Sequence, residues 1–295
     1  MRIHLLSRNS LLYSTQRLFQ AARQAGHEVE IFDYCALNVV FASSRPQLYY
    51  QQEALPAPDL VIGRVSPVYT PLGASLLDQY ALLGTTTAPT ADALLLARNK
   101  WRALGALSRA EVASPRTAML SDLEQLDTIA EQLGGYPLVL KLLQSTHGSG
   151  VMLAPDRRTA RSILDAFAGL HKGILIQEYI KESQGADVRA IVCGTRVVAA
   201  MTRTPASGEF RSNLHRGGTP QQTQLSERES LTVIRAARAV GLDVAGVDFL
   251  RSARGPLVME VNASPGLEGI EGATGVDVAR AIISYLTDRV TEARR

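Results

Sequence analysis

Two apolar runs near the carboxyl end of the chain are interrupted by acids and an amide. The first run, V-A-G-V-D-F-L, carries Asp248, and the second, L-V-M-E-V-N, carries Glu260 and Asn262. The segment S-A-R-G-P between them is rich in turn residues, so the two runs predict an antiparallel β-hairpin. Because side chains alternate along a strand, Glu260 and Asn262 should share one face, and pairing would bring Asp248 beside them.

These three side chains offer two carboxylates and an amide oxygen, a ligand set typical of hard cations such as Mg²⁺. The alternative is that Asp248 and Glu260 cap strand ends or pair with nearby arginines, which is more usual for an isolated acid. An acid and an amide two residues apart within an apolar strand favour the metal site, because burying an unpaired charge is costly.

Strand-like and helix-like patterns alternate over about the first 90 residues. The order is strand, helix, strand, strand, helix, at residues 2–7, 14–25, 27–32, 59–63 and 72–83. Such alternation favours a small parallel α/β module. The turn after the first strand, S-R-N-S, lacks the G-x-G-x-x-G pattern, so no dinucleotide is assigned to it.

The middle of the chain combines a lysine within a strand-like run and a small glycine-containing loop. The run P-L-V-L-K-L-L carries Lys141, and a lysine in such a run usually snorkels or marks an edge strand. The loop Q-S-T-H-G-S-G-V follows, and its backbone N–H groups could approach phosphate oxygens. It is not a Walker A loop, because no Gly-Lys-Ser/Thr follows, and a simple hairpin turn is an equal alternative.

An irregular segment, P-A-S-G-E-F-R-S-N-L-H-R-G-G, lies further along the chain and contains Arg211, Asn213, His215 and Arg216. This density of Arg, Asn and Gly is typical of an anion-binding lid, and a disordered surface excursion is the alternative. Further helices are predicted at 91–110, 121–133, 156–170, 226–240 and 276–294. Further strands are predicted at 151–154, 173–179, 187–193 and 196–201.

Composition excludes several classes of protein. A net charge of +3 over 295 residues is too small an imbalance to predict direct nucleic-acid binding. The two cysteines, Cys35 and Cys193, form no CxxC and indicate neither a disulfide framework nor a zinc site. No apolar run reaches the roughly 18 residues of a membrane span. The first residues, M-R-I-H-L-L-S-R, are too short and too charged for a signal peptide, so a cytoplasmic protein is expected.

Four stretches together resemble the ATP-grasp superfamily, and within it the ribosomal protein modification enzymes of the RimK type. They are L-V-x-K-L at 138–142, Q-E-Y-I-K-E at 177–182, F-R-S-N-L-H-R-G-G at 210–218, and D-V-A-G-V-D followed by G-P-L-V-M-E-V-N-A-S-P-G-L-E-G-I-E within 243–271. Each stretch alone is modest evidence, but all four occur in order at matching spacings.

The resemblance implies a fold of mixed α/β and α+β class. A small parallel pre-ATP-grasp α/β domain would occupy residues 1–95, and a two-subdomain ATP-grasp fold would occupy 96–290. Within the latter, a small lid subdomain would cover about 110–180 and a large catalytic subdomain about 181–290.

The resemblance also implies which residues hold ATP. Lys100 and Lys141 would contact its phosphates as point charges. Glu178 and Tyr179 would lie along the adenine, and Asp187 would hold the ribose hydroxyls. The full nucleotide-binding set is Lys100, Lys141, Thr146, Gly148, Gly150, Glu178, Tyr179, Asp187, Arg211, Ser212 and Asn213.

Lys141, Arg211 and Asn213 are the implied catalytic residues, with the last two at the γ-phosphate, where charge develops during transfer. Asp248, Glu260 and Asn262 would hold two Mg²⁺ or Mn²⁺ ions, with Glu260 bridging. Arg189 and Arg203 would hold an acidic substrate, and for each a structural ion pair is an equal alternative.

The phosphate loop departs from the family pattern at four positions. RimK-type enzymes tend to carry an acid, a glycine, a glutamine and an isoleucine where Gln144, Ser145, His147 and Ser149 stand. Thr146, Gly148 and Gly150 are retained, so cradling of phosphate by the backbone would survive. His147 is interpreted as an exposed loop residue.

The activity that the resemblance implies is ATP-dependent ligation of a carboxylate to an amine through an acylphosphate. The amine would be that of free glutamate, and the carboxylate would be the C-terminus of the sixth small-subunit ribosomal protein. A small-molecule ligase is the nearest alternative, with a glutathione-like, F420-like or amino-group-carrier substrate or free poly-glutamate as product. A nucleotide-sensing module is the other. A homo-oligomer is expected, with a tetramer among the options.

Overall fold

The computed structural model describes residues 1–42, 45–120, 122–143, 150–168, 173–212, 214 and 217–295. The first domain contains a parallel sheet with the strand order β2-β1-β6-β7. Its elements are β1 (Arg2–Leu6), α1 (Tyr13–Gln24), β2 (Glu28–Phe32), β6 (Leu60–Gly63), η1 (Pro67–Tyr69), α2 (Thr70–Leu82) and β7 (Thr86–Ala88). The predicted small parallel α/β module is therefore confirmed.

A second, three-stranded sheet in this domain was not predicted. It consists of β3 (Leu37–Val40), β4 (Gln47–Tyr50) and β5 (Glu53–Leu55), paired antiparallel. The turn from β4 to β5 places Gln51 and Gln52 at φ values of 48° and 72°. Glycine or asparagine usually marks such positive φ angles, so this turn gives no signal in the sequence.

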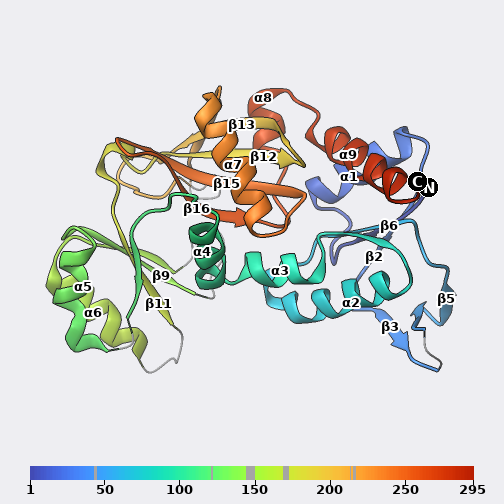
Figure 1. Cartoon of the computed structure of the whole chain (residues 1–295), viewed down its shortest axis with the longest axis horizontal. Helices are drawn as coiled ribbons and strands as arrows, with labels where there is room; N and C mark the ends of the chain where they lie inside the picture. The colour runs from blue at the N-terminus through green and yellow to red at the C-terminus, as the bar shows by residue number, and fades with distance from the viewer. Residues whose placement is uncertain (43–44, 121, 144–149, 169–172, 213, 215–216) are drawn as a thin grey trace.

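The predicted single helix over 91–110 is wrong, because the chain breaks at Asn99. The structure has α3 (Ala91–Arg98) followed by α4 (Lys100–Arg109). Asn99 is extended, with φ −101° and ψ 100°, and its side chain accepts a hydrogen bond of 3.0 Å from the N–H of Arg102. This cap stabilises the start of α4. As a result, Lys100 stands at the first position of α4, where α3 and α4 connect the first domain to the rest of the molecule (Figure 1).

A small antiparallel sheet with two helices follows. The strand order is β10-β9-β11-β8, and Lys141 lies in β9, an inner strand, so its interpretation as an edge-strand marker is wrong. The elements are β8 (Thr117–Met119), η2 (Leu123–Gln125), α5 (Leu126–Gln132), β9 (Leu138–Leu142), β10 (Val151–Ala154), α6 (Arg157–Ala168) and β11 (Ile174–Glu178). The helices α5 and α6 share a buried core with the sheet that is separate from the other cores.

The largest sheet has five antiparallel strands in the order β14-β13-β12-β15-β16. Its elements are η3 (Lys181–Ser183), β12 (Asp187–Cys193), β13 (Arg196–Thr204), β14 (Thr219–Gln222), α7 (Glu227–Ala239), β15 (Val244–Ser252), β16 (Gly255–Asn262), α8 (Glu268–Thr274) and α9 (Val278–Ala293). The predicted hairpins at 187–201 and 244–262 are confirmed. Ser226 and Glu229 form the capping box at the start of α7, with mutual hydrogen bonds of 3.2 and 2.8 Å.

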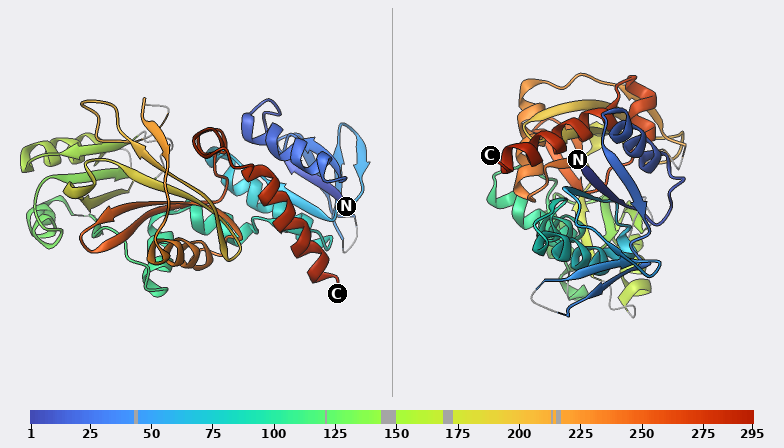
Figure 2. Two further views of the ribbon diagram at one scale, coloured as in Figure 1. Left: turned by 90° about the horizontal axis from the view of Figure 1, so that it is seen from above. Right: turned by 90° about the vertical axis from the view of Figure 1, so that its right-hand side faces the viewer.

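One large core joins the first domain to this sheet. Leu94 of α3, Val233 of α7 and Val247 of β15 are buried in the same apolar cluster. A second cluster joins Leu18 of α1 to Ile282 of α9, which lies along α1 (Figures 1 and 2). The first domain and the five-stranded sheet are therefore packed as one body, whereas the small sheet has its own core.

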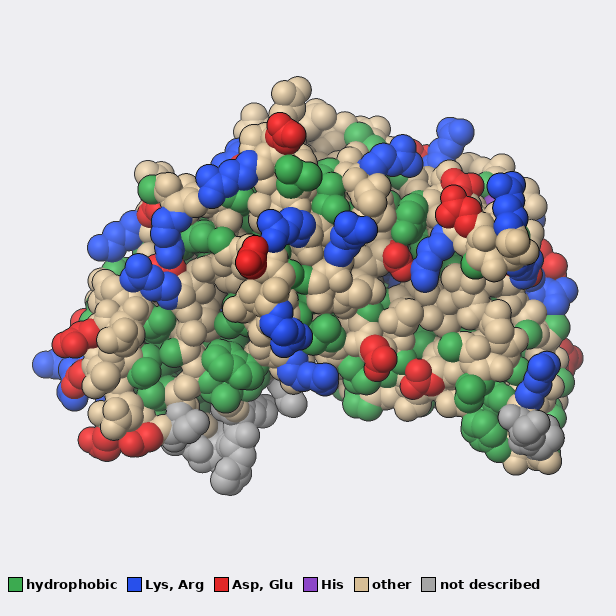
Figure 3. Space-filling view, viewed as in Figure 1, with side chains coloured by type: hydrophobic (Ala, Val, Ile, Leu, Met, Phe, Trp, Pro, Cys, Tyr) green, Lys and Arg blue, Asp and Glu red, His purple; other side chains and the backbone are tan. Residues whose placement is uncertain are grey.

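The two ends of the chain meet at one carboxylate. Asp59 accepts a hydrogen bond of 2.6 Å from the backbone N–H of Arg2 and is ion-paired with Arg294, just beyond α9. Lys and Arg side chains occur in small separate groups over the face shown in Figure 3. In the described part of the chain, no helix combines enough length and apolar character to cross a bilayer.

His4 gives the first domain a pH-dependent stability. The side chain is fully buried in β1, its Nδ1 lies 3.1 Å from the Tyr80 hydroxyl, and burial, assisted by the charge of Arg2, lowers its pKa from 6.5 to about 4. Between these values the unfolded chain takes up a proton that the folded chain does not. We therefore expect His4 to reduce the free energy of unfolding by up to about 3 kcal/mol as the pH falls from 6.5 to 4.

Urea unfolding at several pH values measures this effect. The His4→Phe variant should lose this part of the pH dependence, although it also loses the contact with Tyr80. The prediction is contradicted if the free energy of unfolding changes with pH in the same way in the unmodified protein and in the His4→Phe variant.

Candidate active site

One face of the five-stranded sheet carries alternating charges across neighbouring strands. The register places Asp187 opposite Arg203 and Arg189 opposite Asp248. Arg189 donates to both oxygens of Asp248, at 2.7 and 2.6 Å. Arg203 donates from Nε to Asp187 at 2.7 Å and from Nη2 to both Asp187 and Asp248, the latter at 2.9 Å. The opposite face is apolar and packs against α7.

Asp187, Arg203 and Asp248 are buried, Arg189 is partly buried, and the opposite charges act strongly on one another. Burial alone would raise the pKa of Asp248, but the charges of Arg189 and Arg203 outweigh it and hold that pKa well below its usual range. Burial would likewise lower the pKa of Arg203, but Asp248 and Asp187 raise it instead. In Asp187, burial raises the pKa despite the opposing charge of Arg203. Removing one partner would leave a buried charge without compensation.

The expected metal ligands come together at the edge of this network. Asp248 lies opposite Glu260 in the hairpin of β15 and β16, as predicted. Glu260 is exposed, and its Oε1 accepts a hydrogen bond of 3.1 Å from the Asn262 amide nitrogen. The same nitrogen lies 3.4 Å from the carbonyl oxygen of Gly246, which leaves the Asn262 Oδ1 as the atom available for a cation.

This donor set fits a hard cation. It offers the solvent-accessible carboxylate of Glu260, the amide oxygen of Asn262, and the buried carboxylate of Asp248, whose oxygens also accept bonds from Arg189 and Arg203. No group of three His, Cys, Asp or Glu side chains suited to a metal occurs within the residues that the structure describes. A cation at this hairpin would therefore depend on Asn262 and on oxygens of a bound ligand for the rest of its coordination.

Two lysines from different parts of the molecule approach Glu260. Lys100 begins α4, and its Nζ lies 3.4 Å from the carbonyl oxygen of Leu143, just beyond β9, while Lys141 lies within β9. Burial lowers the pKa of Lys100, and the charge of Glu260 opposes this. Burial also lowers the pKa of Lys141 to about 8, with Glu260 opposing and Lys100 contributing. Two partly buried ammonium groups near each other are suited to a polyanion.

Arg211 links the irregular segment before β14 to the small sheet. Its guanidinium donates to both oxygens of Glu209, at 2.9 and 2.7 Å, and to the carbonyl oxygen of Val151 in β10 at 3.2 Å. The bonds from Arg211 lower the pKa of Glu209 to about 2. Glu209 is not among the residues predicted from the sequence. The available signal was its position, two residues before the predicted catalytic Arg211.

The remaining predicted nucleotide-binding residues are distributed around the small sheet. Glu178 ends β11; its Oε1 accepts from the backbone N–H of Arg116 at 2.6 Å and pairs with Arg254. The backbone N–H of Glu178 donates to the carbonyl oxygen of Arg116 at 3.0 Å. Gly150 has a φ of +72°, and a Cβ there would lie 2.8 Å from Leu142, so only glycine fits.

Tyr179 is half-buried, and Ser212 is buried. Several further predictions lie outside the described residues: Thr146, Gly148, Asn213, His215, Arg216 and the altered loop positions 144, 145, 147 and 149.

Comparison with known proteins identifies the family. Residues 1–94 match the RimK PreATP-grasp domain, and residues 97–286 match the RimK-like ATP-grasp domain. The chain belongs to the RimK-like ATP-grasp family. Two similar relatives of this RimK-like chain are named probable alpha-L-glutamate ligases. The one from Vibrio cholerae is 46% identical and aligned over 100% of this chain and 98% of its own. The one from Pseudoalteromonas atlantica is 47% identical over 97% and 95%.

Solved structures agree with this family fold. The ATP-grasp ligase PsnB, complexed with a minimal precursor, Mg and ADP, has a TM-score of 0.78 and 18% identity over 98% of each chain. A RimK domain ATP-grasp protein from Sphaerobacter thermophilus has a TM-score of 0.71 and 22% identity, over 97% of this chain and 100% of that one. The predicted fold class and the prediction of an ATP-dependent ligase are confirmed for this RimK-like protein.

Proposed function

We propose that the chain joins glutamate to a carboxylate at the expense of ATP, through an acylphosphate. The observation that carries the proposal is the approach of Lys100 to the end of β9, the strand that holds Lys141, with the charge of Glu260 acting on both lysines. It occurs in a RimK-like ATP-grasp chain whose relatives are named probable alpha-L-glutamate ligases. Two cations and a carboxylate at one point suit the phosphates of a nucleotide and the metal that accompanies them.

In the first step, an oxygen of the acceptor carboxylate attacks the γ-phosphorus, and ADP leaves. The substrate amine then attacks the acyl carbon, phosphate leaves, and the nitrogen loses a proton as the amide forms. Two Mg²⁺ or Mn²⁺ ions at Asp248, Glu260 and Asn262 would neutralise charge on the phosphates, with Glu260 as the bridging ligand.

The protein contributes position and charge to both steps. Lys100 and Lys141 hold the phosphates, and Arg211, together with Asn213, serves the transferred phosphoryl group. Arg211 is anchored by Glu209 and reaches the small sheet at Val151, so it connects the large and small subdomains at the site.

Arg189 and Arg203 support the metal site rather than hold substrate. Their guanidinium groups are committed to Asp187 and Asp248, and only 3% of Arg203 is exposed. Asp187 also keeps Arg203 charged. Its proposed role in nucleotide binding is still to hold the ribose. The network fixes the orientation of Asp248, which stands opposite Glu260.

The finer proposal is that the acceptor is the C-terminus of the sixth small-subunit ribosomal protein. Resemblance to RimK-type enzymes supports it. A peptide acceptor is further supported by PsnB and MdnC, structural neighbours whose structures contain precursor peptides. The proposal also includes that the enzyme is cytoplasmic and homo-oligomeric. Its domain boundaries would lie after residues 95 and 180.

A mass measurement tests the acceptor. The protein is incubated with ATP, Mg²⁺, glutamate and the ribosomal protein, and the acceptor is weighed. Mass gains in steps of one glutamate residue support the proposal. Free poly-glutamate, or ADP release only with another acceptor, would assign a small-molecule ligase instead. The absence of acceptor-dependent ADP release under all conditions would contradict the ligase assignment and favour a nucleotide sensor.

The lowered pKa of Lys141 predicts proton uptake when ATP binds. The ammonium is about half ionised at pH 8 in the free protein, and bound phosphates favour its charged form. We therefore expect ATP binding at pH 8 to take up about half a proton. Calorimetry in two buffers of different ionisation enthalpy measures this. Lys141→Met should abolish the uptake, and Lys181→Met, at an exposed lysine of η3, should not. Equal heats in both buffers for the unmodified protein would contradict the assignment.

A further inference from the structure

Two arginines at the carboxyl end of the first sheet form no ion pair with the acids that the structure describes. Arg64 follows β6, and Arg98 ends α3. The Nη2 of Arg64 donates to the carbonyl oxygen of Pro265 at 3.2 Å, and the Nη2 of Arg98 donates to that of Val65 at 2.8 Å. The Nε of Arg98 is buried without a hydrogen-bond partner. Neither guanidinium has a carboxylate within 4 Å among the residues that the structure describes.

Because Arg98 donates to the carbonyl of Val65, the residue after Arg64, the two guanidinium groups lie near each other and their charges repel. Burial lowers the pKa of Arg64 to about 10, and the charge of Arg98 contributes. Burial also lowers the pKa of Arg98, which the charge of Glu260 opposes. Like charges held together by bonds to the backbone destabilise the free protein, and a bound anion would relieve the repulsion. By contrast, the arginines of the five-stranded sheet, Arg189 and Arg203, each have a carboxylate partner.

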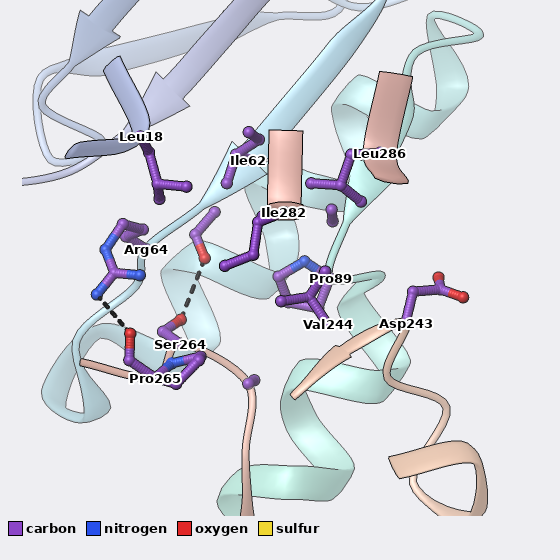
Figure 4. A pocket seen from close by; sticks show the side chains of 13 residues that line it. Leu18, Ile62, Arg64, Pro89, Asp243, Val244, Ser264, Pro265, Ile282 and Leu286 are labelled. Carbon is purple, nitrogen blue, oxygen red and sulfur yellow. Dashed lines mark hydrogen bonds between the residues drawn. The ribbon is translucent and has the colours of Figure 1, made fainter. Parts of the chain in front are cut away.

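The pair lies next to the candidate active site. Figure 4 shows Arg64 bonded to Pro265, three residues beyond Asn262, while the Ser264 hydroxyl donates to the Gly63 carbonyl at 3.2 Å. Arg98 precedes Lys100 by two residues, and the charge of Glu260 acts on both. The cavity beside Arg64 has a volume of about 30 Å³, which is too small for a substrate, so it marks the joint between the domains and does not itself hold a ligand.

We propose that Arg64 and Arg98 form a subsite for an unreacted carboxylate of a substrate, contributed by the first domain. A guanidinium binds a carboxylate through two parallel hydrogen bonds, a geometry that a lysine cannot provide. This inference rests on the proposed ligase function, in which both the free amino acid and the acceptor chain carry such a carboxylate. Bound here, it would hold its substrate beside Lys100 and Glu260, where the phosphoryl group is transferred.

Steady-state kinetics of Arg64→Met and Arg98→Met test the subsite and identify its ligand. We expect the KM for glutamate or the KM for the acceptor to rise about ten- to a hundredfold, with the KM for ATP nearly unchanged. A rise for glutamate assigns the subsite to the amino acid, and a rise for the acceptor assigns it to the acceptor chain. Arg102→Met, at an exposed arginine of α4, is the matched control and should change neither.

Binding without turnover separates this inference from the proposed function. Glutarate, a dicarboxylate without an amine, should raise the melting temperature of the unmodified protein more than inorganic phosphate does, and should not raise that of the Met variants. If the Met variants fold poorly, Arg64→Lys and Arg98→Lys replace them in this test. These variants keep the positive charge and should bind glutarate with intermediate affinity.

An active enzyme whose Met variants keep the KM values of both carboxylate substrates would overturn the subsite, as would a rise in the KM for ATP alone. If the unmodified protein shows no acceptor-dependent ADP release, the proposed function fails. Selective stabilisation by glutarate would still support the subsite, and its absence would overturn it.

Discussion

Replacing Glu260 by alanine should reduce turnover by more than about a hundredfold while the protein remains folded. Loss of a metal ligand should exceed the 10- to 100-fold effect typical of residues that only orient ligands. The fold should tolerate the change, because Glu260 is exposed and its described side-chain contacts are with Asn262 and Asp248. ADP release in the presence of acceptor and glutamate measures activity, and thermal unfolding verifies the fold.

Two further variants separate loss of the ligand from loss of charge at the surface. Glu260→Gln keeps the size of the side chain and removes its charge, so it should also be strongly impaired. Glu268→Ala removes an exposed acid at the start of α8 and should leave activity near that of the unmodified protein. A Glu260→Ala enzyme with nearly full activity would exclude Glu260 as a metal ligand.

Replacing Arg203 by methionine should reduce the free energy of unfolding by about 3–5 kcal/mol, the range seen when one partner of a buried ion pair is removed. The methionine fills much of the same space, but Asp187 then loses its cation and Asp248 loses one of two. Chemical denaturation near pH 7 measures the loss. It should shrink as the pH falls, because protonated carboxyl groups no longer need a cation.

The matched control lies on the same strand. Arg196→Met, at the exposed start of β13, should change stability by no more than about 0.5 kcal/mol. Adding Asp187→Asn to Arg203→Met removes one of the uncompensated charges and should recover part of the lost stability. A loss below about 1 kcal/mol for Arg203→Met would mean that water or a rearranged Arg189 compensates both acids.

The predictions that succeeded rest on patterns within a few residues of one another. Ser226 and Glu229 are three residues apart and cap α7 as expected. Glu260 and Asn262 are two apart in β16, so their common face followed from the alternation of side chains. The fold class followed from several such local patterns occurring in sequence order.

The predictions that failed depend on neighbours distant in the chain or on weak local signals. An edge strand was one of two interpretations of Lys141, but β10 and β11 flank its strand on both sides, and no local pattern reveals that order. Asn99 interrupts an apolar helical pattern without a glycine or proline. For Arg203 the sequence leaves a substrate contact and a structural ion pair as equal alternatives, because its bonds to two acids depend on the register of three strands.

The position of Asp59 has a practical consequence for engineering. It contacts the backbone of Arg2 and the side chain of Arg294, and α9 lies along α1. Termini this close can be joined by a short linker, and new ends can be opened in a surface turn, such as the one between β4 and β5. A circular permutant of this kind should retain both the packing of α9 and the candidate active site, which lies away from the joined ends.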